Sequence, residues 1–339
     1  MSSNPYAFGL GIGTRNKKGD WLEVYFPNPI LNPSAKVFSL FNEFDNQQTI
    51  PKADLVKLAE KLEQTHSQND ALLTAKLSAS SNPVVAVCLD TDAAPKSVPE
   101  AYLKLHLLSH RLVKPHTTDL TGLFGTLRNV AWTSDGPIDI EELNEYRLEA
   151  RSAGRSLSVY SVDKFPQMCD YVVPKGVRIA NSARVRLGAY LGEGTTVMHE
   201  GFVNFNAGTD GPGMIEGRIS AGVKIGAGSD LGGGCSTMGT LSGGNEVKIS
   251  VGEDCLLGAN SGLGIPLGNR CTLEAGLYLT GGSKVEILNS TNELIETVKA
   301  STLSGKDDLL FIRNSLTGAI QCKPNGKSVV LNQTLHKND

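Results

Sequence analysis

Residues 173–203 read VPKGVRIANSARVRLGAYLGEGTTVMHEGFV and carry an aliphatic residue at every sixth position. Neither the period of an amphipathic helix nor the alternation of a hairpin strand explains this spacing. A six-residue repeat is typical of a coil in which each hexad forms one short strand and a corner, and three hexads complete one turn around stacked aliphatic side chains. The stretch therefore predicts a left-handed parallel β-helix. Its aliphatic column is Val173, Ile179, Val185, Leu191, Val197 and Val203.

The period slips twice after Val203 and then resumes. We expect the slips, at about residues 204–217 and 233–248, to be loops that leave the coil. Most of the 37 glycines lie between Gly188 and Gly282, which suits a coil with many tight corners because glycine tolerates positive φ. The column resumes at Ile219, Ile225 and Leu231, at Val251, Leu257 and Leu263, and at Leu267, Leu273, Leu279 and Val285.

The rest of the chain has other periods. Helical spacing occurs in residues 52–64, 99–112 and 138–151, and residues 84–89 are predicted to form a buried strand. We therefore predict an α/β N-terminal domain over residues 1–165, the left-handed β-helix over 166–288 and a short C-terminal β extension over 289–339. In the extension we expect strands at 309–312 and 329–331, with a turn at Pro324, Asn325 and Gly326 between them.

Composition excludes several classes of protein. The 339 residues carry a net charge of -3, so no bulk positive field attracts nucleic acid or an anionic membrane surface. The N-terminus lacks a basic and apolar signal sequence, and no apolar run of about 18 residues occurs, which predicts a cytoplasmic protein. The six cysteines form no CxxC pair, which disfavours a structural zinc site and indicates reduced thiols.

Two motifs have ordinary structural interpretations. Gly9, Gly11 and Gly13 are spaced GxGxG rather than as a phosphate loop, so we predict a strand. His106 and His110 have the spacing of metal ligands on a helix, but no third ligand is evident and we predict a solvated helix face. Hexapeptide coils with three converging histidines bind zinc as carbonic anhydrases, and the repeat region contains only His199.

His199 and Glu200 are an adjacent acid–base pair at the edge of the first slip. From spacing alone two interpretations stay open, a loop cap or a catalytic pair. Beyond them lie Glu216 and Arg218, then the glycine-rich stretch LGGGCSTMGTLSGG at 231–244. Its many backbone N–H groups suit a phosphate or a pantetheine chain, and a flexible loop is the alternative.

The run TTVMHEGFVNFNAGT at 195–209, followed by MIEGRISAG, SDLGGG, MGTLSGG, LLGANSGLGIPLG and EAGLYLTGG, resembles the tetrahydrodipicolinate N-succinyltransferases of bacterial lysine biosynthesis, in their long form. The resemblance covers about residues 158–285 and reaches LLFIRNS near the C-terminus. It implies a homotrimer with active sites between subunits, succinyl-CoA as cosubstrate and no tightly bound cofactor. The acceptor it implies is the amine of ring-opened tetrahydrodipicolinate, L-2-amino-6-oxopimelate. Nothing in the sequence supports a divalent metal.

The resemblance also implies roles for individual residues. Glu200 matches the catalytic glutamate of the motif MHEGF, either as general base or as a nucleophile that passes through an acyl anhydride. If residues 199 and 200 are extended, their side chains point to opposite faces and only one reaches the site. The acceptor carries two carboxylates, for which Arg186 and Arg218 are the candidates. The candidate succinyl-CoA contacts are Gly217, Ser220, Ser242, Gly243, Gly258, Ala259, Lys284, Arg313 and Asn314.

Two functions remain as alternatives. Another CoA-dependent acyltransferase built on hexapeptide repeats would share the coil and accept a different acyl donor. A non-catalytic β-helix scaffold would show no thermal shift with CoA.

Overall fold

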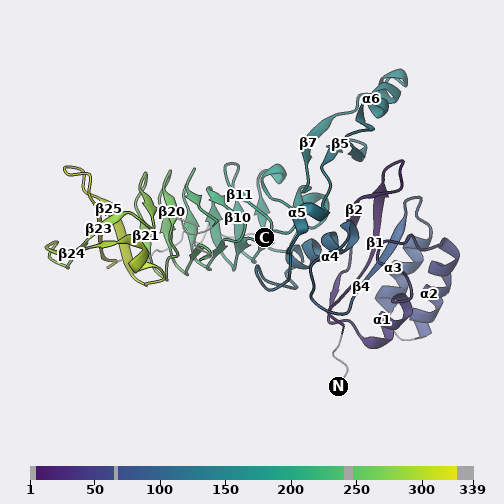
Figure 1. The fold of residues 1–339 in the computed structure, drawn as a ribbon, viewed down its shortest axis with the longest axis horizontal. Coiled ribbons are helices and arrows are strands. Elements are labelled where there is room, and N and C mark those ends of the chain that lie inside the picture. The colour runs from purple at the N-terminus through teal and green to yellow at the C-terminus, as the bar shows by residue number, and fades with distance from the viewer. Residues whose placement is uncertain (1–4, 65–67, 240–246, 327–339) are drawn as a thin grey trace. The chain divides into compact units, whose positions relative to one another are not determined.

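The computed structural model describes residues 5–64, 68–239 and 247–326. The chain forms two compact units, the first made of Met1–Val113 with Thr117–Pro166 and the second of Lys114–His116 with Gln167–Asp339 (Figure 1). Each unit has its own sheets. Among the described residues, no helix combines the length and apolar character needed to cross a membrane.

The first unit is built on an antiparallel sheet with β1 (Ala7–Arg15) in its centre. On one side β1 pairs with β4 (Val84–Leu89), and on the other with β2 (Trp21–Tyr25) and β3 (Ile30–Leu31). One face packs on α1 (Ala35–Phe41), α2 (Lys52–Gln64) and α3 (Gln68–Ser78) through a core that includes Phe8 and Leu10. The predicted helix at 52–64 and strand at 84–89 are confirmed.

The glycines of β1 face the opposite side of this sheet, where α4 (Val98–Ser109) lies. A methyl group on Gly9 would come within 2.7 Å of Leu103 and 2.6 Å of Phe26, and one on Gly11 within 2.6 Å of Val24. The GxGxG pattern therefore lets large side chains lie directly against the strand. The prediction that it is a strand and no phosphate loop is confirmed.

The predicted solvated face of α4 is wrong. His106 is fully buried, with Nδ1 bonded to the Tyr102 carbonyl at 2.8 Å and Nε2 accepting from the Phe26 amide at 3.3 Å. Burial lowers the pKa of His106 to about 3, and it also lowers the pKa of His110. The neutral imidazole thus holds the chain where β2 ends, because a buried amide needs a partner.

A small second sheet completes the first unit. It has the order β6 (Gly136–Asp139), β5 (Val130–Thr133), β7 (Val159–Asp163), and α5 (Leu123–Thr126) precedes it. The helix predicted from Ile138 begins later, as α6 (Leu143–Ser152). Ile138 belongs to β6 instead, because Gly136 turns the chain at φ 98° into a hairpin with β5.

The second unit is a coil of short strands stacked as three parallel sheets, called faces 1 to 3 (Figure 1). Face 1 contains β8 (Arg178–Ile179), β10 (Thr195–Val197), β13 (Gly213–Ile215), β16 (Asp230–Leu231), β19 (Leu256–Leu257) and β21 (Thr272–Leu273). Face 2 contains β11 (Phe202–Val203), β14 (Arg218–Ile219), β17 (Ser236–Thr237), β20 (Gly262–Gly264) and β22 (Tyr278–Thr280). Face 3 contains β9 (Tyr190–Leu191), β12 (Gly208–Thr209), β15 (Lys224–Ile225) and β18 (Ser250–Val251). The predicted fold class, an α/β domain followed by a parallel β-helix, is confirmed.

The predicted column forms the interior of the coil. Leu191, Val197 and Val203 are fully buried, and Val185 is 1% exposed. At the start of the coil Ile179 is half-buried and Val173 is 71% exposed, because Val173 precedes β8 and has no neighbouring strand among the described residues.

The two period slips are not the loops that were expected. Residues 204–217 contain β12 and β13, and Val203 pairs with Ile219, so this slip is a coil shortened between Ile215 and Ile219. The second slip begins later than predicted, because Ser236 and Thr237 still form β17. Residues 240–246 of the predicted second loop lie outside the described part of the chain.

The C-terminal extension continues face 1. β25 (Leu309–Arg313) pairs in parallel with β21, and β26 (Ile320–Pro324) lies between β25 and β23 (Lys284–Leu288), which pairs with β24 (Leu294–Lys299). The predicted strand at 309–312 is confirmed. A turn at 314–318, where Gly318 has φ 76°, leads into β26, a strand that the sequence did not predict. The turn predicted at 324–326 follows β26 and stays a prediction, because the strand after it is not described. Residues 329–331 lie outside the described part, and the boundary at 288 stays a prediction.

Candidate active site

The outer surface of face 2 carries three of the arginines. Side chains alternate along a strand, so the residues on either side of each buried aliphatic residue point outward. Arg184 and Arg186 flank buried Val185, which pairs with Val203 of the next coil. One coil further along, Arg218 pairs with Phe202 and directly precedes buried Ile219. We call Arg184, Arg186 and Arg218 the face 2 arginines.

Each of the face 2 arginines contacts an uncharged neighbour. The guanidinium carbons of Arg184 and Arg186 lie 5.7 and 5.9 Å from the ring centre of Phe202. Arg218 donates from Nε and Nη2 to Ser236 Oγ at 3.1 and 2.6 Å. Among the described residues no carboxylate forms an ion pair with Arg184 or Arg218. The surface therefore presents positive charge suited to carboxylates.

Glu200 lies at the corner that connects β10 with β11. The corner is a turn closed by the Gly201 amide and the Met198 carbonyl at 3.0 Å. Arg184 holds it from outside by donating to the Glu200 carbonyl at 2.9 Å and the Gly201 carbonyl at 3.1 Å. The Glu200 side chain is exposed, and within the described ranges no group donates a hydrogen bond to its carboxylate. A capping carboxylate would accept an N–H, so the described contacts do not support the loop-cap interpretation, and the catalytic role of Glu200 stays a prediction.

The premise that residues 199 and 200 are extended is wrong. Both lie in the turn, and both are exposed. The alternation of side chains along a strand therefore does not separate His199 from Glu200, and the choice between them rests on the motif.

The corner between faces 1 and 2 recurs in every coil and forms one edge of the β-helix. Starting from the corner of Glu200, it carries Gly217, then Gly233, then Gly258 and Ala259, joined by hydrogen bonds such as Asn260 N to Gly233 O at 2.9 Å. At about 4.8 Å per coil, Ala259 lies roughly 14 Å along the edge from Glu200. We call this the donor edge.

Two glycines of the donor edge, Gly217 and Gly258, are required by packing between coils. A methyl group on buried Gly217 would lie 2.3 Å from Cys235 Sγ and 2.6 Å from the Cys235 carbonyl oxygen. One on Gly258 would lie 2.4 Å from the Ala275 nitrogen. Ala259, in contrast, is exposed.

The other predicted donor contacts are spread more widely. Arg313 lies beyond the donor edge, where its amide donates to Glu274 Oε2 at 2.6 Å, and Asn314 Oδ1 accepts from the amides of Leu316 and Thr317 in the following turn. Ser220 lies on face 2 and donates to the Thr237 carbonyl at 2.6 Å. Exposed Lys284 begins β23, away from the donor edge corners. Ser242 and Gly243 lie outside the described residues.

Sequence reasoning missed Arg184 and Asn204. Asn204 accepts from Arg186 Nη1 at 3.2 Å, and Arg184 anchors the turn of Glu200. The sequence could have indicated both residues, because Arg184 precedes Val185 and Asn204 follows Val203 in the aliphatic column, so their side chains must point outward. No group of three or more histidine, cysteine, aspartate or glutamate side chains suited to a metal ion occurs in the described part of the chain.

Comparisons with known proteins agree with this geometry. Family models described as tetrahydrodipicolinate N-succinyltransferase N-terminal and middle match residues 29–125 and 127–167, and one described as hexapeptide repeat of succinyl-transferase matches 248–281. A 2,3,4,5-tetrahydropyridine-2,6-dicarboxylate N-succinyltransferase of Pseudomonas putida is 59% identical, covering 99% of each chain.

The chain belongs to the tetrahydrodipicolinate N-succinyltransferase family.

Other members of the family extend the comparison. The enzyme of the same name from Vibrio cholerae is 55% identical over 98% of this chain and 99% of its own. The crystal structure of a Campylobacter jejuni protein assigned as a 2,3,4,5-tetrahydropyridine-2-carboxylate N-succinyltransferase superposes with a TM-score of 0.88 at 34% identity, covering 96% and 94% of the two chains. The resemblance inferred from the motifs is confirmed along the whole chain.

Proposed function

We propose that the protein transfers the succinyl group of succinyl-CoA to the amine of L-2-amino-6-oxopimelate, the ring-opened form of tetrahydrodipicolinate, in lysine and diaminopimelate biosynthesis. The observation that carries the proposal is the match, over nearly the full length of both chains, to enzymes named for this reaction. The arrangement of Glu200 beside the face 2 arginines supports it.

The residues of the site suit the chemistry of the transfer. The amine attacks the thioester carbonyl, the carbon–sulfur bond breaks, and CoA leaves as a thiolate that takes up a proton. The exposed carboxylate of Glu200 accepts the proton of the amine in the general-base course. In the alternative course it attacks the thioester first and forms an acyl anhydride, which the amine then opens.

The acceptor has two carboxylates, and the face 2 arginines suit them. Arg218 donates to the neutral Ser236 hydroxyl and Arg186 donates to the Asn204 amide oxygen, and paired guanidinium N–H groups of this kind suit a substrate carboxylate. Arg184 acts differently, since it holds the backbone of Glu200 and positions the carboxylate.

The donor is proposed to lie along the donor edge. Ala259 is exposed roughly 14 Å from the corner of Glu200, a span suited to an extended pantetheine arm. Gly217 and Gly258 keep the coils close and leave their edge free of side chains, while Arg313 offers positive charge for CoA phosphates at the far end of this edge. Lys284 lies away from these corners and is proposed as a phosphate contact only from the resemblance.

We further propose a homotrimer with active sites between subunits. A closed cyclic assembly lets one subunit cover the face 2 arginines of the next, which an isolated coil leaves exposed to water. We place the enzyme in the cytoplasm, where succinyl-CoA is made, and all six cysteines are free, as expected of a reducing compartment. Succinyl-CoA acts as a cosubstrate, and no tightly bound cofactor is proposed.

The test is release of free CoA from succinyl-CoA in the presence of tetrahydrodipicolinate. Glu200→Gln keeps the size of the side chain and removes the basic oxygen, so kcat should fall by roughly 10² to 10⁴ with donor binding retained. His199→Ala, the adjacent control in the same turn, should cost much less. Equal losses in the two variants would contradict the assignment of Glu200, and preference for acetyl-CoA would favour another acyltransferase.

A further inference from the structure

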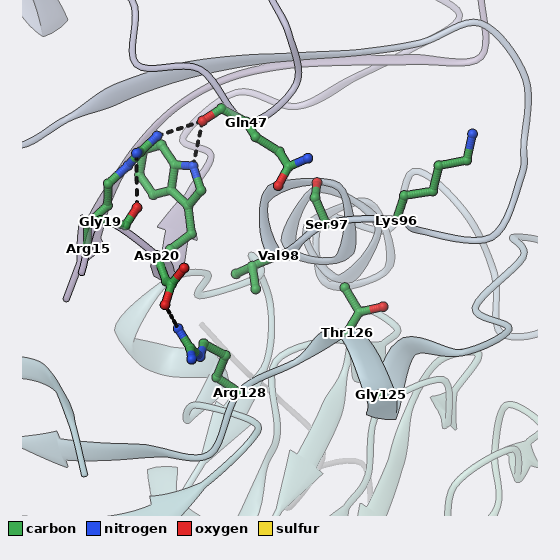
Figure 2. Close-up of a pocket in the computed structure, with 11 residues that line it drawn as sticks. Arg15, Gly19, Asp20, Gln47, Lys96, Ser97, Val98, Gly125, Thr126 and Arg128 are labelled. Carbon is green, nitrogen blue, oxygen red and sulfur yellow. Dashed lines mark hydrogen bonds and ion pairs between the residues drawn. The ribbon is translucent and has the colours of Figure 1, made fainter. Parts of the chain in front are cut away.

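The first unit contains a polar cavity of about 430 Å³ that the succinyl transfer does not use (Figure 2). Its wall comes from four parts of the chain: the β1–β2 hairpin with Arg15 and Asp20, the loop of Gln47, the start of α4, and the segment that ends at Arg128. A volume of this size is within the range of small-molecule sites.

Arg15 is a half-buried cation without an anionic partner at ion-pair distance in the described ranges. Its guanidinium lies 4.2 Å from the ring centre of Trp21 and donates to the carbonyl oxygens of Gly19 at 3.0 Å and Gln47 at 2.6 Å. Its Nε–H is buried and has no hydrogen-bond partner there. Burial lowers the pKa of Arg15, and the neighbouring Asp20 carboxylate partly opposes this effect, so the charge keeps a desolvation cost.

Trp21 and Gln47 fix the position of this guanidinium. Trp21 Nε1 donates to the same Gln47 carbonyl at 2.8 Å, so one oxygen accepts from both side chains (Figure 2). The ring supports the flat side of the guanidinium, and the carbonyls occupy part of its edge. Such a cation is preorganised, since little rotamer freedom remains to be lost when an anion binds.

A second arginine faces the same cavity. Arg128 Nη1 forms an ion pair with Asp20 Oδ2 at 2.6 Å, and Figure 2 shows this pair across the cavity from Val98 and Thr126. The charges of Arg15, Arg128 and Asp20 leave an excess of one positive charge. Lys96 adds a more distant one, because its side chain extends away from both arginines (Figure 2).

The acidic residues nearby do not cancel this excess within the cavity. Asp139, which attracts Arg128, accepts from Asn16 Nδ2 at 2.8 Å, and Glu141 pairs with Lys18 at 2.6 Å. Neither of them lines the cavity.

We propose that this cavity binds a small oxyanion, a compound carrying a carboxylate or phosphate group, between Arg15 and Arg128. Guanidinium groups recognise both kinds of oxyanion through paired N–H donors. The hydroxyl groups of Ser97 and Thr126 and the methyl groups of Val98 would contact the remainder of the ligand. The site is separate from the face 2 arginines and from the donor edge, which belong to the other unit.

The test is calorimetric titration of the full-length protein with inorganic phosphate at low ionic strength, in the presence of saturating CoA. CoA fills the proposed donor edge, so phosphate that still binds lies in this cavity or on the face 2 arginines, and the Arg128→Gln variant distinguishes the two. One phosphate per chain is expected, with affinity that falls as salt is added. Arg128→Gln should weaken binding by about tenfold or more. Arg155→Gln is the matched control, because Arg155 forms a comparable exposed ion pair with Asp135 at 2.9 Å and should change affinity less than about twofold.

Two further variants change the charge of the cavity wall without removing an arginine, and they test phosphate binding even if Arg128→Gln fails to fold. Asp20→Asn removes the competing carboxylate and should tighten phosphate binding, an effect that a purely structural pair would not produce. Thr126→Asp adds a negative charge to the wall and should weaken binding. The proposal is overturned if phosphate does not bind, if CoA displaces it, if Asp20→Asn leaves the affinity unchanged, or if Arg128→Gln and Arg155→Gln weaken it equally. That last pattern would indicate an adventitious ion only.

Discussion

Gly258 of the donor edge is expected to tolerate no side chain. A methyl group there would lie 2.4 Å from the Ala275 nitrogen, 2.7 Å from the Ala275 Cα and 2.9 Å from the Glu274 carbonyl carbon. All three atoms are backbone, so no flexible side chain can move aside. Ordinary contact begins at 3.4 Å, and two coils would have to separate locally by about 1 Å.

That separation would stretch the hydrogen bonds between the coils. The Gly258 amide donates to the Leu273 carbonyl at 2.7 Å, and the Gly276 amide donates to the Ala259 carbonyl at 2.8 Å. Overpacking of this kind costs about 1–3 kcal/mol, and a rigid backbone on the far side puts Gly258→Ala near the upper value. For a unit of this size, about 3 kcal/mol lowers Tm by roughly 6–12 °C.

The assay is thermal unfolding followed by circular dichroism at one fixed protein concentration, because assembly makes Tm depend on concentration. Gly282→Ala is the control, since a methyl group there meets nothing within 4 Å and Gly282 does not have positive φ. Its Tm should equal or slightly exceed that of the unmodified protein. A Gly258→Ala variant that unfolds within about 2 °C of the Gly282→Ala control would refute the packing argument.

Three other outcomes follow from the same geometry. Ala259→Trp, at an exposed position on the donor edge, should raise KM for succinyl-CoA with unchanged circular dichroism, and unchanged donor kinetics would remove Ala259 from the site. Arg218→Lys keeps the charge but loses the paired N–H donors, so KM for the acceptor should rise by about tenfold while KM for succinyl-CoA stays constant. His116 bonds Gly222 O through Nε2 and Lys248 Nζ through Nδ1, both at 2.7 Å, and burial first and Lys248 second lower its pKa. Neutral His116 therefore stabilises the fold above about pH 6.5, and this stabilisation is lost as the pH falls through the lowered pKa of His116 in the folded protein. His116→Gln should accordingly flatten the acid side of a plot of Tm against pH.

The arginines show which parts of the site the sequence could predict. Arg186 and Arg218 were candidates because dicarboxylates need guanidinium partners, and both lie on the outer surface of face 2. Arg184 was missed because its role is to bind two backbone carbonyls at the corner of Glu200, and the conformation of that corner is not visible in a hexad pattern. The cavity around Arg15 and Arg128 was equally invisible, since four separate segments form its wall.

The sequence by itself determined the β-helix. Where strands stack around one axis, the residue at every sixth position is buried and mostly aliphatic, with Thr209 and Thr237 at two of these positions. This constraint is local enough to appear as a period in the sequence from Val185 to Val285. The family motif MHEGF at 198–202 is likewise a continuous stretch of sequence, so it could be recognised without the structure.

Only the tertiary structure decided whether a slip in the period is a loop or a shortened coil, and which polar residues are buried. A shortened coil and an excursion produce the same loss of phase, and the pairing of Val203 with Ile219 separates them. The spacing of His106 and His110 suggested an exposed face of α4. In the structure the chain leaves β2 beside α4, and His106 is buried because the Phe26 amide after β2 donates to it. These outcomes depend on which segments meet across the fold, because a buried polar group is partnered by whatever lies beside it in space rather than in sequence.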